Sequence, residues 1–157
     1  MTSMSRRCWL QASVVGSVPC ACMAKATNEC CTIPELTADS VRIESNAITV
    51  DLARTPALSK IGSYVKVTDA TRQLRILIAR PAKDSFVALD QKCTHGGGAL
   101  TYVHKHKHLY CTCWGHSRFA LNGSVLFWPN KQVPRPIRAY RVQRAGNLLQ
   151  IELDGAS

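Results

Sequence analysis

Residues Cys93 to Phe119 read CTHGGGALTYVHKHKHLYCTCWGHSRF and hold the most informative motif of the chain. It contains Cys93 and His95 as a Cys-x-His pair, and Cys113 and His116 as a Cys-x-x-His pair. Each pair offers one thiolate and one imidazole, which are ligands that suit zinc and iron. Because the two pairs are far apart in sequence, we expect them on two loops that hold a metal centre between them.

The mixed composition of each pair bears on which metal they bind. Zinc fingers usually pair two cysteines at one short spacing and two histidines at another. A [2Fe-2S] cluster with two cysteines on one iron and two histidines on the other suits mixed pairs, with one thiolate and one imidazole from each loop. A zinc-stabilised structural module is the alternative interpretation of the same residues.

Three segments resemble the Rieske family of iron–sulfur proteins. Cys93-Thr-His-Gly-Gly-Gly resembles its first cluster-binding loop, Tyr110 to Phe119 resembles its second loop, and Val133 to Ile137 resembles the proline-bearing segment that covers the cluster. The resemblance covers about residues 55 to 153. It implies a [2Fe-2S] cluster that transfers one electron at a time, bound by Cys93, His95, Cys113 and His116. It implies no catalytic residue in this chain.

The second loop departs from the usual Rieske pattern. It reads Cys111-Thr-Cys113-Trp-Gly-His116, one residue longer than the common form. Cys113 keeps the two-residue gap before His116 and is the predicted ligand. Cys111, through a longer loop, is the alternative.

The N-terminus has the order of a signal peptide, with a charged start, an apolar stretch and a small-residue cleavage site. Ser5-Arg-Arg-Cys-Trp-Leu-Gln11 resembles the twin-arginine export motif, and Ala24-Lys-Ala26 suits cleavage. We therefore expect a signal helix over residues 1–26 and export to the periplasm. The apolar stretch falls short of the roughly 20 residues that span a bilayer, so membrane attachment is expected only if the signal is retained as an anchor.

Short apolar runs broken by turn residues predict many strands and no long helix after residue 40. The fold class is therefore all-β, a small antiparallel sandwich or barrel with a two-loop cluster-binding subdomain. We expect linker and lead-in strands over residues 27–54 and the cluster domain over residues 55–154. The predicted strands are residues 41–44, 47–52, 64–68, 74–79, 86–89, 108–111, 119–121, 124–127, 137–142 and 148–153.

Charge and composition limit the classes of molecule that the protein is expected to bind. The chain has 157 residues and a net charge of +10, but no nucleic-acid-binding motif accompanies that charge. We therefore expect no nucleic acid. The expected partner is a redox protein or a larger catalytic subunit, with an acidic docking face. The run from His104 to His108 invites a metal-site interpretation, but a solvated turn between two strands is the preferred one.

The leading hypothesis is an electron carrier, or an electron-transfer subunit of an exported oxidoreductase, resembling the small Rieske subunit of arsenite oxidase. The alternative is a soluble Rieske ferredoxin that serves an oxygenase. An oxygenase in its own right would need a second domain with mononuclear iron, for which this chain has no room.

Overall fold

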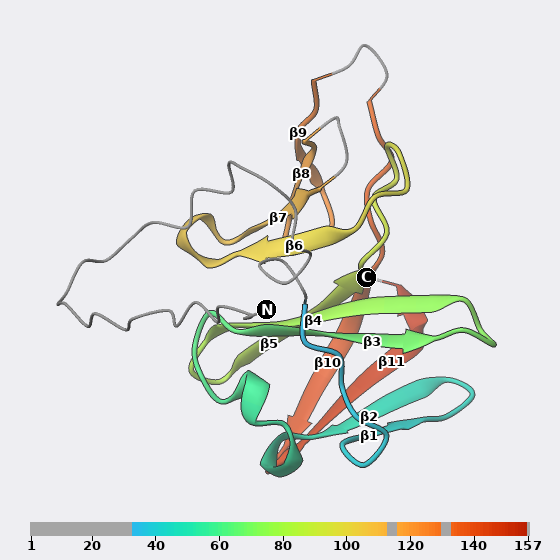
Figure 1. Ribbon diagram of the computed structural model, residues 1–157, viewed down its shortest axis with the longest axis vertical. Coiled ribbons are helices and arrows are strands. Elements are labelled where there is room, and N and C mark those ends of the chain that lie inside the picture. The colour runs from blue at the N-terminus through green and yellow to red at the C-terminus, as the bar shows by residue number, and fades with distance from the viewer. Residues whose placement is uncertain (1–32, 113–115, 130–132, 157) are drawn as a thin grey trace, which may run out of the picture. The chain divides into compact units, whose positions relative to one another are not determined.

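The computed structural model describes residues 33–112, 116–129 and 133–156 (Figure 1). The predicted signal helix lies outside these residues. In the part of the chain that is described, no helix is long and apolar enough to cross a membrane. The described residues form strands joined by turns and three short 3-10 helices, as the all-β prediction requires.

Seven strands form one antiparallel sheet in the order β1-β2-β11-β10-β5-β4-β3. Strand β2 pairs with the closing strand β11, so the segment before residue 55 is part of this sheet. The bounds are β1 (Val41–Ile43), β2 (Ala47–Asp51), β3 (Tyr64–Asp69), β4 (Leu74–Ala82), β5 (Ser85–Asp90), β10 (Ala139–Ala145) and β11 (Leu148–Ala156).

Four further strands form a second antiparallel sheet in chain order (Figure 1). They are β6 (Leu100–Val103), β7 (His108–Cys111), β8 (Arg118–Ala120) and β9 (Val125–Phe127). The sequence did not predict β6, because its short alternating pattern directly follows the glycine run. The 3-10 helices are η1 (Leu52–Arg54), η2 (Pro56–Leu58) and η3 (His104–His106).

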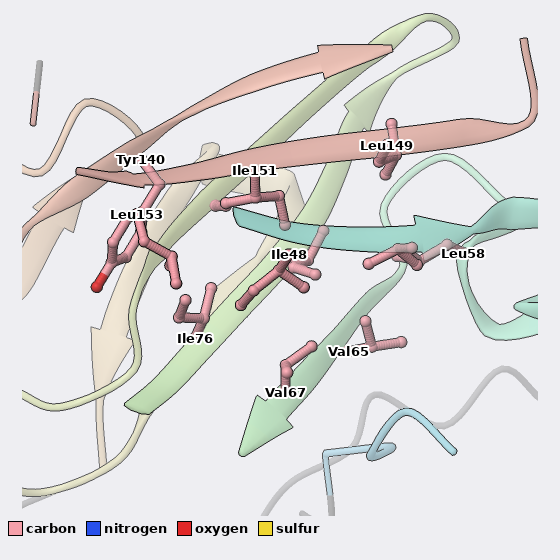
Figure 2. Packing of buried hydrophobic residues seen from close by; sticks show 12 residues of the cluster. Ile48, Leu58, Val65, Val67, Ile76, Tyr140, Leu149, Ile151 and Leu153 are labelled. Carbon is pink, nitrogen blue, oxygen red and sulfur yellow. The ribbon is translucent and has the colours of Figure 1, made fainter. Parts of the chain in front are cut away.

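A first hydrophobic core lies within the seven-stranded sheet. Ile48 of β2 and Val65 of β3 belong to it, although their strands stand far apart in the order of the sheet. Figure 2 shows these side chains pointing toward a common interior together with Ile76 and Ile151. The sheet therefore curls so that strands near its two ends pack against each other.

A second core joins the two sheets through strand β4. The run Ile76-Leu77-Ile78-Ala79 is completely buried, and its side chains alternate between the two cores. Because successive side chains of a strand point to opposite faces, a continuous apolar run is what a strand covered on both sides requires. The prediction of a buried strand over residues 74–79 is confirmed.

Two local predictions were wrong. The strand predicted over residues 74–79 ends too early, because β4 continues through Pro81 to Ala82 and its pairing with β5 shifts register between Ala79 and Ala82. Proline is tolerated in a strand where such a bulge interrupts the ladder. The turn after β6 is present as η3 with Lys107 in the left-handed region, but His108 is buried as the first residue of β7.

Candidate metal centre

The first predicted loop leaves β5 and returns as β6. The amide of Cys93 donates to the carbonyl of Gly98 at 2.8 Å, and the amide of Gly97 donates to the carbonyl of Cys93 at 2.9 Å. Gly97 has a φ of +72°, which a residue without a side chain adopts readily. These bonds close the loop tightly and carry His95 at its tip.

The second predicted loop joins β7 to β8. The amide of Cys111 donates to the carbonyl of Ser117 at 2.9 Å, so Cys111 occupies the same place in this loop as Cys93 does in the first. His116 is described and has a φ of +48°. Cys113, the predicted ligand, lies outside the described residues.

The two loops are joined directly. Leu100 pairs with Cys111 where β6 meets β7. One residue beyond this pair, the amide and the hydroxyl of Thr112 both donate to the carbonyl of Ala99, at 3.0 and 2.9 Å. Segments separated in sequence by η3 and two strands therefore meet side by side, as a centre shared between two loops requires.

The proline-bearing segment reaches the first loop. The hydroxyl of Thr94 donates to the carbonyl of Arg135. The amide of Ile137, the last residue of this segment, donates to the carbonyl of Gly123 in the β8–β9 turn at 3.0 Å. The segment is thus tied at one point to the first loop and at another to the second sheet.

Cysteine and histidine side chains differ in exposure at this site. Cys93 and Cys111 are 1% and 0% exposed and belong to the second core. His95 is half-buried, and His116 is exposed. A thiolate ligand buried in the core and an imidazole at the surface would place a metal centre at the edge of the protein, within reach of a redox partner.

Tyr110 contacts His116, and sequence reasoning did not single it out. The Tyr110 hydroxyl lies 2.5 Å from Nδ1 of His116, and the two rings are stacked with centroids 5.4 Å apart. Nothing in the local sequence signals this contact, because it depends on the tertiary placement of His116 against Tyr110 of β7.

Ser117 is the polar exception in the second core. Its side chain is completely buried, and among the described residues its Oγ is the buried side-chain nitrogen or oxygen atom that has no hydrogen-bond partner. A buried hydroxyl without a partner costs roughly 1–3 kcal/mol, so such an atom calls for an acceptor. Ser117 directly follows His116 in the chain, so we expect that acceptor at the candidate centre.

Three of the four predicted ligands, Cys93, His95 and His116, lie in the described residues. Within residues 33–112, 116–129 and 133–156, no three His, Cys, Asp or Glu side chains lie close enough together to hold a metal ion. Cys113, the fourth predicted ligand, lies outside these residues. The residues present nevertheless fit a mixed thiolate and imidazole centre in donor type, in the joining of the two loops and in the unsatisfied Ser117 hydroxyl.

Comparison with known proteins gives a family match. The model of the Rieske [2Fe-2S] domain matches residues 50–141, more than half of the chain. No curated protein matches the chain.

Among the solved structures to which the chain is similar is a cyanobacterial plasma membrane Rieske protein from Synechocystis PCC 6803. It is 21% identical, with a TM-score of 0.48 over 65% of this chain and 94% of that one. Another is the ferredoxin of carbazole 1,9a-dioxygenase from Nocardioides aromaticivorans IC177. It is 18% identical, with a TM-score of 0.48 over 59% of this chain and 86% of that one.

Proposed function

The chain belongs to the Rieske [2Fe-2S] domain family and binds a [2Fe-2S] cluster, and on this premise we propose that it is an exported one-electron carrier or electron-transfer subunit. The cluster, when bound, accepts and releases a single electron, at a potential of about −150 to +300 mV in mixed-ligand centres of this kind. The chain itself supplies the ligands, the shielding from water and the surface for a redox partner.

We propose Cys93 and His95 from the first loop, and His116 with Cys113 or Cys111 from the second, as the ligands. The observation that carries this proposal is the joining of the two loops by the bonds from Thr112 to Ala99. The matched bonds that close the loops at Cys93 and Cys111 favour Cys111. The two-residue gap before His116 favours Cys113.

Two serine variants separate these ligands. Replacing the cysteine that binds iron with serine should abolish the mixed-ligand [2Fe-2S] signal of the reduced protein in electron paramagnetic resonance. The other variant should keep that signal. Because Cys111 is completely buried in the second core, Cys111→Ser should lower the thermal midpoint whichever cysteine binds iron. A colourless wild-type protein containing zinc would overturn the proposed function.

The exported location rests on Arg6 and Arg7 in the predicted twin-arginine motif and on the cleavage site ending at Ala26. We expect the wild-type chain in the periplasm without residues 1–26, and the double variant Arg6→Lys, Arg7→Lys in the cytoplasm at full length. Cell fractionation and N-terminal sequencing measure both. A wild-type chain found intact in the cytoplasm would favour a soluble ferredoxin for an oxygenase instead of a subunit resembling that of arsenite oxidase.

A further inference from the structure

A row of side chains crosses the outward face of the four-stranded sheet. The register places Tyr110 of β7 opposite Arg118 of β8, and Arg118 opposite Phe127 of β9. The Arg118 guanidinium carbon lies 5.2 Å from the centroid of the Phe127 ring. Because Tyr110 also stacks on His116, the row leads from a proposed ligand to the edge strand of the sheet.

A cleft of about 430 Å³ opens on this row, lined by Val103, His106, His108, Tyr110 and Arg118. The rings of His106 and His108 are stacked with centroids 5.6 Å apart. Burial lowers the pKa of His108 below its ordinary value, and the charges of Arg118 and His106 lower it further. Arg118 therefore supplies the permanent charge of the cleft, and its planar fork of donors matches a carboxylate.

Charge is strongly segregated along this part of the chain. Between Asp90 and Glu152 the sequence has no Asp or Glu, but it has nine Lys or Arg residues and all five histidines. Both predicted loops, all four strands of the second sheet and the proline-bearing segment fall in this stretch. The stretch also includes β10 and the start of β11 in the seven-stranded sheet. Its part before residue 128, with both loops and the second sheet, has four Lys or Arg residues, Arg118 among them, and no acidic residue, so it attracts an approaching acidic surface.

Apolar side chains are exposed on β9 and directly after it, and Phe127 among them contacts Arg118 of the cleft. Leu126, Phe127 and Trp128 are 54%, 45% and 37% exposed. An apolar centre with charged groups at its rim is the usual composition of a protein–protein interface, in which aromatic and arginine side chains are enriched. The charge and the aromatic side chains together therefore favour a protein partner.

We propose that the outward face of β7, β8 and β9 docks an acidic redox-partner protein, with an Asp or Glu carboxylate of that partner bound to Arg118 in the cleft. This proposal rests on the electron-transfer function proposed above, and it adds the face, the anchoring residue and the charge of the partner. Because Tyr110 both lines the cleft and contacts His116, a partner held there lies beside a proposed ligand at the protein surface.

The test uses the cluster-loaded full chain and a reduced plant-type [2Fe-2S] ferredoxin with an acidic surface as the probe. Stopped-flow absorbance gives the second-order rate constant of electron transfer, and titration calorimetry gives the dissociation constant. The variants are Arg118→Gln, Arg118→Lys and, in the adjacent turn, Lys105→Gln. The matched control is Arg42→Gln, which removes the same charge from an exposed position on β1.

Loss of a docking charge should act on association and on its salt dependence. At low salt we expect Arg118→Gln to lower the rate constant and the affinity about 3- to 10-fold, Lys105→Gln to lower them less, and Arg118→Lys to restore part of the loss. Arg42→Gln should match wild type. At about 1 M salt, where the screening length is near 3 Å, the differences should vanish.

Equal effects of Arg118→Gln and Arg42→Gln would overturn the proposal, since they would reflect net charge alone. Arg118-dependent binding to phosphatidylserine vesicles, with unchanged ferredoxin binding, would overturn it in favour of a membrane surface. The calorimetric arm does not need electron transfer. A chain without a [2Fe-2S] spectrum that still binds the ferredoxin through Arg118 would therefore refute the proposed function and leave the docking face standing.

Discussion

Thr112 joins the two loops of the candidate centre by donating both its amide and its hydroxyl hydrogen to the carbonyl oxygen of Ala99, at 3.0 and 2.9 Å. The amide bond depends only on the backbone, whereas the hydroxyl bond depends on the side chain. Replacement of Thr112 therefore tests how much the side chain adds to the joining of the loops.

We predict that Thr112→Val destabilises the cluster-loaded protein by about 1 kcal/mol, the usual contribution of one hydrogen bond. Bleaching of the visible absorbance during incubation should also be faster, because the two loops separate more easily. Thr101→Val is the matched control in the same hairpin, since the Thr101 hydroxyl bonds at only 3.4 Å within the β6–β7 pair. Equal bleaching rates in the two variants would contradict the prediction.

Ser117→Ala should lower the reduction potential. The buried Ser117 hydroxyl has no partner among the described residues, and a donor directed at a cluster sulfur favours the reduced, more negative form. A difference of about 1–2 kcal/mol between the two redox states corresponds to about 40–90 mV for one electron. Redox titration followed by circular dichroism measures it.

The unfolding of Ser117→Ala provides the check. If the hydroxyl serves only to fill space, the potential should stay within error of wild type while the thermal midpoint changes. A lowered potential is the expected result, and a small fall in the midpoint should accompany it, because the bond from the hydroxyl to the cluster is lost.

Gly123→Ala should prevent stable folding. Gly123 has a φ of +87°, and an added Cβ would lie 2.1 Å from the carbonyl oxygen of Ile137, which is backbone and cannot rotate away. The carbonyl of Gly123 also accepts a hydrogen bond from the amide of Ile137, so the change would displace the end of the proline-bearing segment. We expect a loss of more than about 3 kcal/mol, seen as a much lower thermal midpoint or as insoluble protein.

Gly146→Ala is the control for backbone conformation alone. Gly146 has a φ of +60°, but an added Cβ would meet no atom within 4 Å. The expected cost is about 1–2 kcal/mol, that of an alanine in the left-handed region. Similar midpoints for the two variants would show that the contact with Ile137 does not matter.

Tyr140 should contribute to the stability of the folded protein at alkaline pH. Its hydroxyl donates to the carboxylate of Asp90. Burial is the larger cause, and this hydrogen bond the next, that raises the pKa of Tyr140 far above its usual value. The folded state therefore holds the proton more tightly than the unfolded state does. Its contribution is complete below the unfolded pKa of about 10 and is lost progressively as the pH rises above it.

Tyr140→Phe removes both the bond and this titration. At pH 7 the variant should be less stable by about 1–2 kcal/mol, since a hydrogen bond to a charged acceptor is lost. Between pH 10 and about 12 the difference from wild type should shrink, because only wild type still has the tyrosine proton to lose. Thermal midpoints at fixed heating rate measure both effects, and parallel pH curves would contradict the second.

Most strands of the fold were predictable because their side-chain patterns are local. The apolar run from Leu74 to Ala79 predicts a strand buried on both faces, and in the structure the second core packs against one of these faces. Strand β6 and the continuation of β4 through Pro81 were not predictable in this way. Both depend on pairing with a neighbouring strand, which outweighs the local preference of glycine and proline for turns.

The cofactor and the family could be predicted from the Cys and His residues and their spacing, which are a property of the chain. The surroundings of these residues follow from the tertiary structure. It placed Cys111 in the second core, joined Thr112 to Ala99, set Tyr110 against His116 and aligned Arg118 with Phe127. The physical reason is that these contacts follow from strand register and loop closure, which bring distant residues together and leave no local pattern in the sequence.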